Sequence, residues 1–252
     1  MRILFAPSEG KTRPSVENFT PSECLKNLRV CFGEREKFVR EYLGILTHGE
    51  DAEICKLFGV KNLKNSLDEL GLCAHLLEAP TMQAIELYSG VAYKALGFAS
   101  LEARAREYVL KNLFIFSNLF GMVAASDALP FYKLNQNYKG KMLNLKALYK
   151  AMEGDLDAFF AKSDGGGVLD LRAEVYIKAY ALKCPHIVAD FLKGGKKVSH
   201  FAKHYRGVFV REMALRGVED SAGIEALEVE SMRLVDRREE GLCTRLVYEV
   251  LA

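Results

Sequence analysis

The stretch VSHFAKHYRGVFVREMALRG, residues 198–217, is the part of this sequence around which the rest can be arranged. At 100° per residue it separates into two faces, which predicts an amphipathic helix. The apolar face carries Phe201, Tyr205, Val208 and Phe209. The opposite face is basic and carries His200, Lys203, His204, Gly207 and Arg211, with Arg206 at its edge. Gly207 costs about 1 kcal/mol of helix stability relative to Ala. Either a ligand or a loop approaches the backbone there, or packing tolerates a glycine in a solvated face.

Length and composition predict one globular domain spanning residues 1–252. Half of the 252 residues are apolar, 27% are charged, and the net charge is +2. No run approaches the roughly 18 apolar residues of a membrane span, and the N-terminal apolar run is too short for a signal peptide. The six cysteines form no C-x-x-C pair. We therefore expect a cytoplasmic protein with reduced thiols, no membrane contact and a monomeric state. Because the net charge is small, a nucleic-acid partner would have to meet a local basic patch.

Strand and helix patterns alternate along the second half of the chain, which predicts an α/β fold with a mixed sheet and surrounding helices. Short apolar runs predict strands over residues 2–6, 113–117, 168–180 and 186–194, and two more within 227–251. Helical periodicity predicts helices over residues 34–46, 80–88, 100–112 and 143–162, and much of 21–79 looks helical as well.

Residues 50–70 have the outline of a helix-hairpin-helix element. Two expected helices, 50–58 and 63–70, are joined by LFGVKN, residues 57–62. Such a turn grips a nucleic-acid backbone through its N–H groups and nearby lysines, here Gly59, Lys61 and Lys64. An ordinary αα-hairpin in a helical layer would give the same pattern.

Three further stretches carry polar or aromatic residues beside predicted strands. PSEGKT, residues 7–12, ends like a phosphate-binding loop but has Phe5 where the first glycine would stand, so it either holds an anion or is an ordinary loop. Tyr88 and Tyr93 flank Ser89-Gly90 and form either a stacking site or core packing. The loop DALPFYKLNQNYKGK, residues 127–141, is a candidate for ligand contacts. Asp170 lies inside a predicted strand, where a carboxylate needs a partner or a site.

Taken together, the blocks PSEGKT, LYSGVAY, SNLFG with LPFYKL, LDLRAEVY and FAKHYRG resemble the YaaA family of bacterial peroxide-stress proteins. The resemblance spans nearly the whole chain, with the blocks in the family's order. It implies a single α/β domain with a helix-hairpin-helix-like element and a positively charged cleft. It also implies a DNA-binding protein that limits free iron and oxidative DNA damage under hydrogen peroxide stress. No enzymatic reaction is firmly attached to the family, so whether the chain is an enzyme stays open.

The resemblance carries over to a defined set of positions. They are Ser8, Gly10, Lys11 and Thr12, then Gly90 and Tyr93, then Ser117, Gly121, Asp127 and Tyr132, then Tyr176 and Lys178, and finally Lys203, Arg206, Gly207 and Arg211. The chain departs from the family's pattern at Val91, Ala124-Ala125, Asn135 and Asp170. These departures weaken a strictly shared active site but leave the basic residues in place.

Three functions follow as hypotheses. In the first, double-stranded DNA binds a basic cleft lined by Lys11, Lys133, Lys203, Arg206 and Arg211, with the Gly59 turn and Lys61 as further contacts. In the second, the same cleft belongs to an enzyme that acts on a nucleotide or a damaged base, with Lys11 or Asp170 in an acid–base or nucleophilic role. In the third, His200 and His204, four residues apart, bind iron. No third acidic or thiol ligand accompanies them in the sequence, so we expect neither a metal site nor a cofactor.

Overall fold

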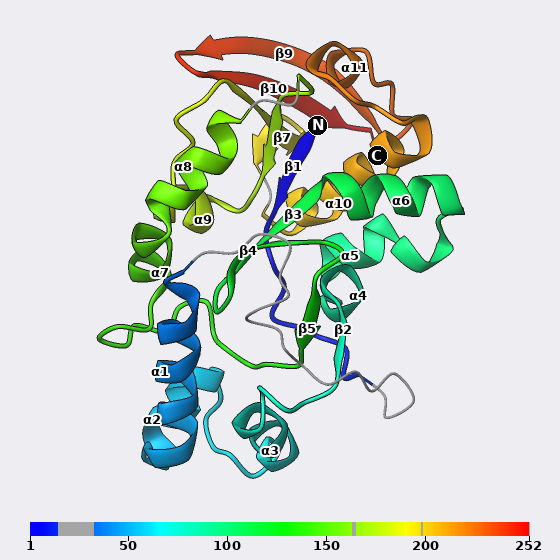
Figure 1. The fold of residues 1–252 in the computed structure, drawn as a ribbon. Coiled ribbons are helices and arrows are strands. Elements are labelled where there is room, and N and C mark those ends of the chain that lie inside the picture. The colour runs from blue at the N-terminus through cyan, green and yellow to red at the C-terminus, as the bar shows by residue number, and fades with distance from the viewer. Residues whose placement is uncertain (15–32, 163–164, 198, 252) are drawn as a thin grey trace.

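A mixed β-sheet runs through the molecule and joins strands from both ends of the chain (Figure 1). The computed structural model describes residues 1–14, 33–162, 165–197 and 199–251. The strand order is β4-β3-β1-β6-β7-β10-β9, and the short β8 pairs with β7. The strands are β1 (Arg2–Phe5), β3 (Leu113–Ser117), β4 (Gly121–Ala124), β6 (Val168–Leu171), β7 (His186–Lys193), β8 (Lys196–Lys197), β9 (Met232–Glu240) and β10 (Cys243–Val250). The α/β fold with a mixed sheet, as predicted, is confirmed.

The centre of the sheet is parallel and buried. β1 pairs in parallel with β3 on one side and β6 on the other, and β6–β7 and β7–β10 are parallel as well. Every residue of β1, β3 and β6 is buried. Strands covered on both faces read as continuous apolar runs, which is why residues 2–6 and 113–117 are recognisable from sequence. β9, by contrast, lies at an end of the sheet, pairs only with β10, and is largely exposed.

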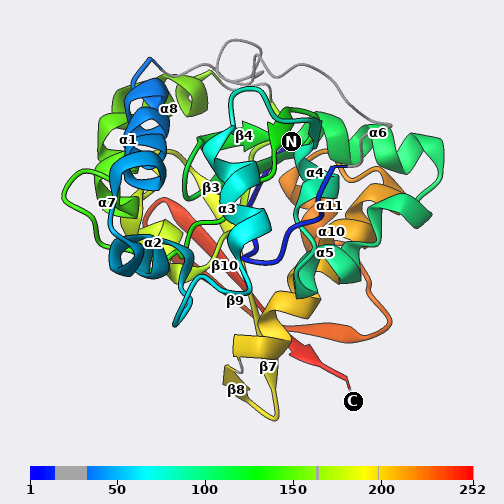
Figure 2. The ribbon, with the colours of Figure 1, turned by 90° about the horizontal axis from the view of Figure 1, so that it is seen from below.

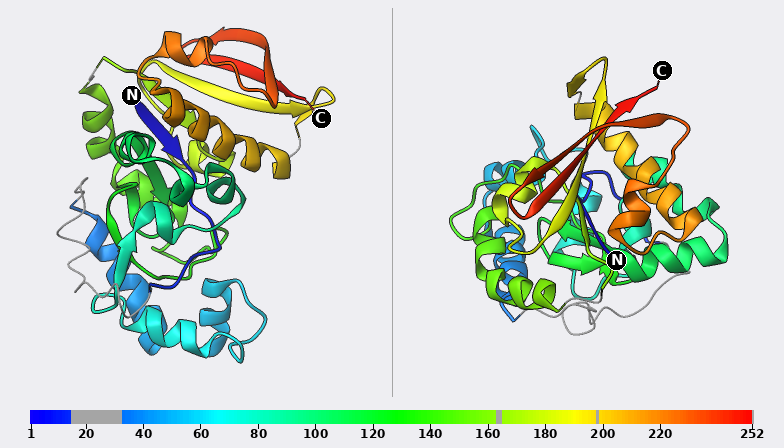
Figure 3. Two further views of the ribbon diagram at one scale, coloured as in Figure 1. Left: turned by 90° about the vertical axis from the view of Figure 1, so that its right-hand side faces the viewer. Right: turned by 90° about the horizontal axis from the view of Figure 1, so that it is seen from above.

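Helices cover both faces of the sheet (Figures 1 and 3). One side carries α5 (Val91–Leu96), α6 (Ala103–Asn112) and α10 (Ser199–Arg216). The other carries α7 (Leu145–Ala151), α8 (Glu153–Ala161) and α9 (Glu174–Ala179). α10 packs against α5, α6 and β7, and its Phe209 meets Phe191 of β7 and Tyr248 of β10. The expected helix over 198–217 is therefore present, with Val198 outside the described residues.

A second group of elements lies beyond the carboxyl ends of the central strands, and Figure 2 shows it from below. It consists of α1 (Arg35–His48), α2 (Asp51–Phe58), α3 (Leu67–Ala74) and the two-stranded sheet of β2 (Thr81–Gln83) and β5 (Ala128–Pro130). The remaining short helices are α4 (Ala84–Leu87), η2 (Phe98–Ser100) and α11 (Ser221–Glu225). No helix in the described part of the chain is both long and apolar enough to cross a bilayer.

Several predicted boundaries were wrong. Residues 168–180 are not one strand, because the chain turns after Leu171 and residues 174–179 form α9. Residues 143–162 form two helices that meet at Met152, and the helix expected from Leu63 begins at Leu67. The helix expected over 80–88 begins with β2 and becomes helical only at Ala84. The helical expectation for residues 21–32 lies outside the described residues.

The predicted faces of α10 need a correction as well. Phe201, assigned to the apolar face, is 42% exposed, whereas Gly207, assigned to the basic face, is buried. The reason is that α5 covers α10 on the side where Gly207 lies, so the helix is buried on more than one side. The core-facing residues continue into Val210, Met213 and Ala214.

Candidate functional site

The carboxyl ends of β1 and β6 form a topological switch point. β1 lies between β3 and β6 in the sheet, and Phe5 and Leu171 are register partners at the last position of each strand. Of the strands that follow β1 in the chain, β3 lies on one side of β1 in the sheet and β6 lies on the other. In parallel α/β sheets the crevice beyond such a pair of strand ends is where ligands bind.

A pocket of about 310 Å³ lies at this switch point, and we call it the switch pocket. The residues after both strand ends contribute to it, together with α5, α9 and α10. Its lining comprises Phe5, Ala6, Pro7, Ser8, Glu9, Gly10, Gly90, Val91, Ala92, Tyr93, Gln136, Leu171, Ala173, Tyr176, Lys203 and Arg206. The structure thus brings together predicted residues from the first, second, fourth and last blocks of the sequence.

The loop after β1 is fastened to the start of α5. The Tyr93 hydroxyl donates to the Ala6 carbonyl (2.8 Å), and the Gly90 N–H donates to the Ser8 hydroxyl (3.1 Å). The Ser8 hydroxyl in turn donates to the Gly10 carbonyl (2.7 Å). A Cβ on Gly90 would lie 2.5 Å from Ser8 Cβ, so only glycine permits this approach. The pocket wall is therefore shaped by contacts between two distant sequence blocks. The side chain of Thr12 is not part of that wall.

Two of the residues that line this pocket each have a buried polar atom without a hydrogen-bond partner. These atoms are Nε of Arg206 and the hydroxyl of Tyr176, and no other buried side-chain nitrogen or oxygen in the described residues shares this property. Burial lowers the pKa of the Arg206 guanidinium, an effect that nearby Asp170 and Asp190 oppose. Burial raises the pKa of Tyr176, so its hydroxyl stays protonated. Leaving a buried polar group unpaired costs about 1–3 kcal/mol, so both atoms are suited to an external partner.

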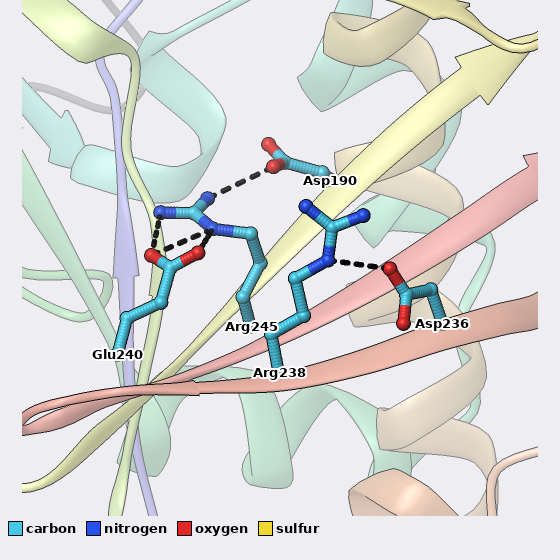
Figure 4. Close-up of polar contacts among 5 residues, drawn as sticks. All are labelled: Asp190, Asp236, Arg238, Glu240 and Arg245. Carbon is cyan, nitrogen blue, oxygen red and sulfur yellow. Dashed lines mark hydrogen bonds and ion pairs between the residues drawn. The ribbon is translucent and has the colours of Figure 1, made fainter.

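The two carboxylates near Arg206 are engaged by other arginines. Asp170 accepts two bonds from the Arg172 guanidinium, at 2.8 Å from Nε and 2.6 Å from a terminal nitrogen, and both side chains are buried. Asp190 accepts a bond of 2.8 Å from Arg245, which also binds Glu240 (Figure 4). Arg206 thus stands near two acidic groups without an ion pair to either in the described structure.

A neighbouring pocket of about 650 Å³ shares Ala173, Lys203 and Arg206 with the switch pocket. Asp170, Arg172, Asp190 and Arg245 line it too. Lys203 and Arg206 therefore stand at the boundary between the two spaces. A ligand larger than the switch pocket can extend past them into this neighbouring space.

Lys11 and Lys133 face a separate space on the other side of the loop, which we call the lysine pocket. Its volume is about 410 Å³, and it shares Glu9 and Gly10 with the switch pocket. Its lining comprises Glu9, Gly10, Lys11, Phe58, Gly59, Val60, Glu69, Phe131, Tyr132, Lys133, Leu134 and Asn135. The five basic residues predicted for one cleft are thus divided between two pockets and a helix contact.

Arg211 and Gly207 serve helix packing. The Arg211 guanidinium donates to the carbonyls of Leu96 (2.9 Å) and Gly97 (3.3 Å) at the end of α5. A Cβ on Gly207 would lie 2.0 Å from the Ala92 carbonyl oxygen, so the backbone of α5 fills the space predicted for a ligand or loop. That expectation for Gly207 is corrected: the glycine permits two helices to touch.

Other predicted site residues lie apart from the switch pocket. Lys178 is exposed and pairs with Glu174 one turn away on α9 (2.6 Å). Gly59 ends α2 in a left-handed conformation (φ 70°) and lies against Asn135, while Lys61 is exposed beyond it. Helix-hairpin-helix contacts with nucleic acid stay a prediction.

The third sequence block forms a buried hydrogen-bond network under the lysine pocket. The Tyr132 hydroxyl lies 2.9 Å from the hydroxyls of both Tyr88 and Ser117, and it donates to Asn118 (3.0 Å). Gly121, the first residue of β4, has a left-handed φ of 70°. Asp127 caps the same hairpin by accepting from the Ala124 N–H (2.8 Å). The network thus links Tyr132 in the wall of the lysine pocket to Ser117 at the end of β3.

No three His, Cys, Asp or Glu side chains gather into a metal-binding group in the described part of the chain. The ring of His204 lies edge-on to Tyr205. The side chain of His200 lies outside what the structure describes.

A family model described as "Peroxide stress protein YaaA" matches residues 1–237. The chain belongs to the YaaA family of peroxide stress proteins. An uncharacterized protein of Campylobacter jejuni is 35% identical over 252 residues, with both chains covered completely. A UPF0246 protein of Corynebacterium glutamicum strain R is 34% identical over 243 residues, covering 91% of each chain. A UPF0246 protein of Streptomyces coelicolor is 28% identical over 249 residues, covering 90% of this chain and 88% of its own. A role in the peroxide stress response follows for this YaaA-family member.

Sequence reasoning missed two residues that line the pockets described above, Arg172 and Glu69. Arg172 neutralises Asp170, and Glu69 binds Lys133 and also Arg13 (3.4 Å). Arg172 stands two positions after Asp170, and that short spacing was a usable signal. Glu69 had none, because its partners lie 64 and 56 positions away in sequence.

Proposed function

We propose that this protein acts in the peroxide stress response by binding a phosphate-bearing nucleotide in the switch pocket. The observation that supports this is the pair of buried, unpartnered atoms on Arg206 and Tyr176. An anionic oxygen beside Arg206 would complete its hydrogen bonding and compensate its charge. Lys203 at the mouth of the same pocket adds a second cation.

A nucleotide suits the rest of the lining. Tyr93 and Phe5 pack edge to face (5.4 Å between ring centroids), and with Tyr176 they give the pocket aromatic walls. Aromatic faces stack on bases, and arginine and lysine bind phosphate. The pocket's size is at the lower end of small-molecule sites, and the adjoining space beyond Arg206 extends it. The nucleotide is free or belongs to a nucleic acid that presents it unstacked.

Titration of the purified protein with a fluorescent nucleotide tests this proposal, with unlabelled nucleotide and inorganic phosphate as competitors. We expect Arg206→Ala to weaken binding by at least about tenfold, the equivalent of about 1.4 kcal/mol. Arg216→Ala is the matched control, since Arg216 lies on the same helix, is exposed and pairs with Glu212. Equal affinity of wild type and Arg206→Ala, or no nucleotide binding by the wild type, would contradict the proposal.

DNA binding is the second candidate function, and it is favoured by an exposed basic patch at the end of β7, in β8 and at the start of α10. Lys193 lies over the ring of Phe201 (4.5 Å), and Lys196 and Lys203 are exposed in the adjoining β8 and α10. Lysines neutralise phosphates, and an exposed ring stacks on a base. Duplex and single-stranded oligonucleotides should be compared over a salt series. If these lysines contact DNA, the double variant Lys196→Ala/Lys203→Ala should make the negative slope of log affinity against log salt shallower by about 2. An unchanged slope excludes this contact.

Limitation of free iron, which the family resemblance implied, stays a prediction. Measuring labile iron and DNA lesions in peroxide-treated cells with and without the Arg206→Ala variant would connect it to the switch pocket. If both quantities match those of the wild type, the pocket plays no part in iron limitation.

A further inference from the structure

Lys11 is held with its amine facing the lysine pocket. The residue follows Gly10 in the loop after β1, and its backbone forms an antiparallel bridge with Tyr88. Its Nζ donates to the carbonyl oxygens of Ser8 (3.1 Å) and Glu9 (3.4 Å). Two backbone carbonyls of the preceding turn therefore hold the amine, and Lys11 lines a cavity of about 410 Å³.

The surroundings of this amine are aromatic and carry no carboxylate bonded to it. Nζ lies 4.2 Å from the ring centroid of Tyr132 and 5.5 Å from that of Tyr88. Two carboxylates line the pocket, Glu9 and Glu69. Glu69 binds Lys133 and Arg13, whereas Glu9 lends Lys11 only its backbone carbonyl. No ion pair to Lys11 occurs among the described residues. Burial lowers the pKa of Lys11 to about 8, an effect that Cys73 and Glu9 oppose and to which Lys133 adds.

The two lysines of the pocket thus differ in kind. Lys133 is bound to Glu69 and also lies near the Ser66 hydroxyl (3.5 Å). Lys11, at a pKa of about 8, is neutral in roughly a quarter of molecules at pH 7.5, against roughly one in a thousand for an ordinary lysine. A nucleophilic amine beside a fixed cation is the arrangement that carbonyl chemistry uses.

We propose that Lys11 is a nucleophilic amine that forms an imine with a small aldehyde bound in the lysine pocket. The neutral Nζ attacks the carbonyl carbon, a C–N bond forms, and the carbonyl oxygen takes up a proton to give a carbinolamine. Loss of that oxygen as water, with release of the amine proton, leaves the C=N bond. Amine and aldehyde are converted to imine and water, so no oxidant or reductant is consumed. This inference does not rest on nucleotide binding, because Lys11 and Arg206 line different pockets.

Reductive trapping tests the inference directly. The full-length protein is treated with propanal and sodium cyanoborohydride at pH 7, and alkylation of each lysine is followed by peptide mass spectrometry. We expect Lys11 to react at least about tenfold faster than Lys133, which is bound to Glu69 in the same pocket, and than exposed Lys61, because its lowered pKa makes more of the Lys11 amine neutral. A rate no greater than that of Lys133 or Lys61 would overturn the assignment.

Two further measurements separate a reactive amine from a merely accessible one. The rate at Lys11 should rise with pH and level off above about 8, well below the ordinary lysine value of about 10.4; a rate that is still rising at pH 10 would overturn the proposal. Lys11→Arg keeps the charge over Tyr132 and removes the nucleophile, so fast labelling should vanish while other lysines react as before. Fast labelling that persists elsewhere in the pocket of a folded Lys11→Arg protein would assign the reactive amine to another residue.

The outcome for nucleotide binding is distinguishable. Arg206→Ala should lose nucleotide affinity and keep fast labelling of Lys11. Loss of that labelling in Arg206→Ala would overturn the separation of the two pockets.

Discussion

Gly207 of α10 lies directly against the carbonyl oxygen of Ala92 on α5, so closely that a Cβ on Gly207 would come within 2.0 Å of that oxygen. Backbone atoms, unlike the ends of flexible side chains, cannot move aside cheaply. The Gly207→Ala variant should therefore lose about 2 kcal/mol or more of unfolding free energy, even though Ala favours a helix by about 1 kcal/mol. Urea unfolding measures this. The control is Gly44→Ala in α1, where a Cβ meets nothing within 4 Å and should be neutral or stabilising.

Arg211 should behave as a structural residue and leave ligand binding alone. Its guanidinium binds two carbonyls at the end of α5 and the hydroxyl of Ser100 (3.0 Å). Arg211→Ala should lower the unfolding free energy by about 1–3 kcal/mol and leave nucleotide affinity within twofold of wild type. A loss of affinity in a fully folded Arg211→Ala protein would return this residue to the binding site.

Asp170 should be essential for stability because its partner cannot reach water. Replacing one member of the buried Asp170–Arg172 pair leaves an uncompensated charge, so Asp170→Asn should cost about 3–5 kcal/mol. Glu174→Gln removes one member of the exposed pair with Lys178 and should cost less than about 1 kcal/mol. Thermal and chemical unfolding of both variants gives the comparison. Similar losses in the two would mean that the Asp170 site relaxes on mutation.

Lys11 should make stability depend on pH in a defined direction. Its pKa is about 8 in the folded protein and near 10.5 when unfolded. Between these values the unfolded chain holds a proton that the folded chain has released, so the free energy of unfolding rises with pH. Relative to Lys11→Met, wild type should gain up to about 3 kcal/mol from pH 8 to pH 10.5. A difference that is flat or falls over this window contradicts the lowered pKa.

A side chain added at Gly90 should be tolerated better when the side chain of Ser8 is removed. Gly90→Ala places a Cβ where Ser8 Cβ already lies, which displaces the loop that forms one wall of the switch pocket. We expect Gly90→Ala to weaken nucleotide binding by about tenfold, and Ser8→Gly in the same chain to restore part of it. A double variant as weak as the sum of the two single losses would show that the loop does not transmit the clash.

The sequence was most informative where physical constraints are local. Continuous apolar runs identified β1 and β3 because strands covered on both faces need such residues. Residues 168–180 misled because the strand ends at Leu171 and a helix of six residues, α9, follows at once. So short a helix adds too little periodic signal to be distinguished from a continued strand.

Contacts between distant segments explain the remaining differences. Gly207 looked like space for a ligand because nothing near it in sequence announces that Ala92 lies against it. Arg206 seemed marginal at the edge of a helical face, and only the folded arrangement shows that its Nε is buried and unpartnered. The five blocks of family resemblance named many residues near the site, but their division between two pockets follows from tertiary structure.

The contact between Gly207 and Ala92 also bears on how the switch pocket responds to an occupant. α10 carries Arg206, α5 begins beside Gly90, and Gly90 touches Ser8 in the loop after β1. A series of close contacts thus links the part of the pocket wall on α10 with the part in the loop after β1, so we expect these two parts of the wall to move together. We therefore expect ligand binding to involve little rearrangement, because the conformational entropy of ordering the pocket walls is lost during folding and not on binding.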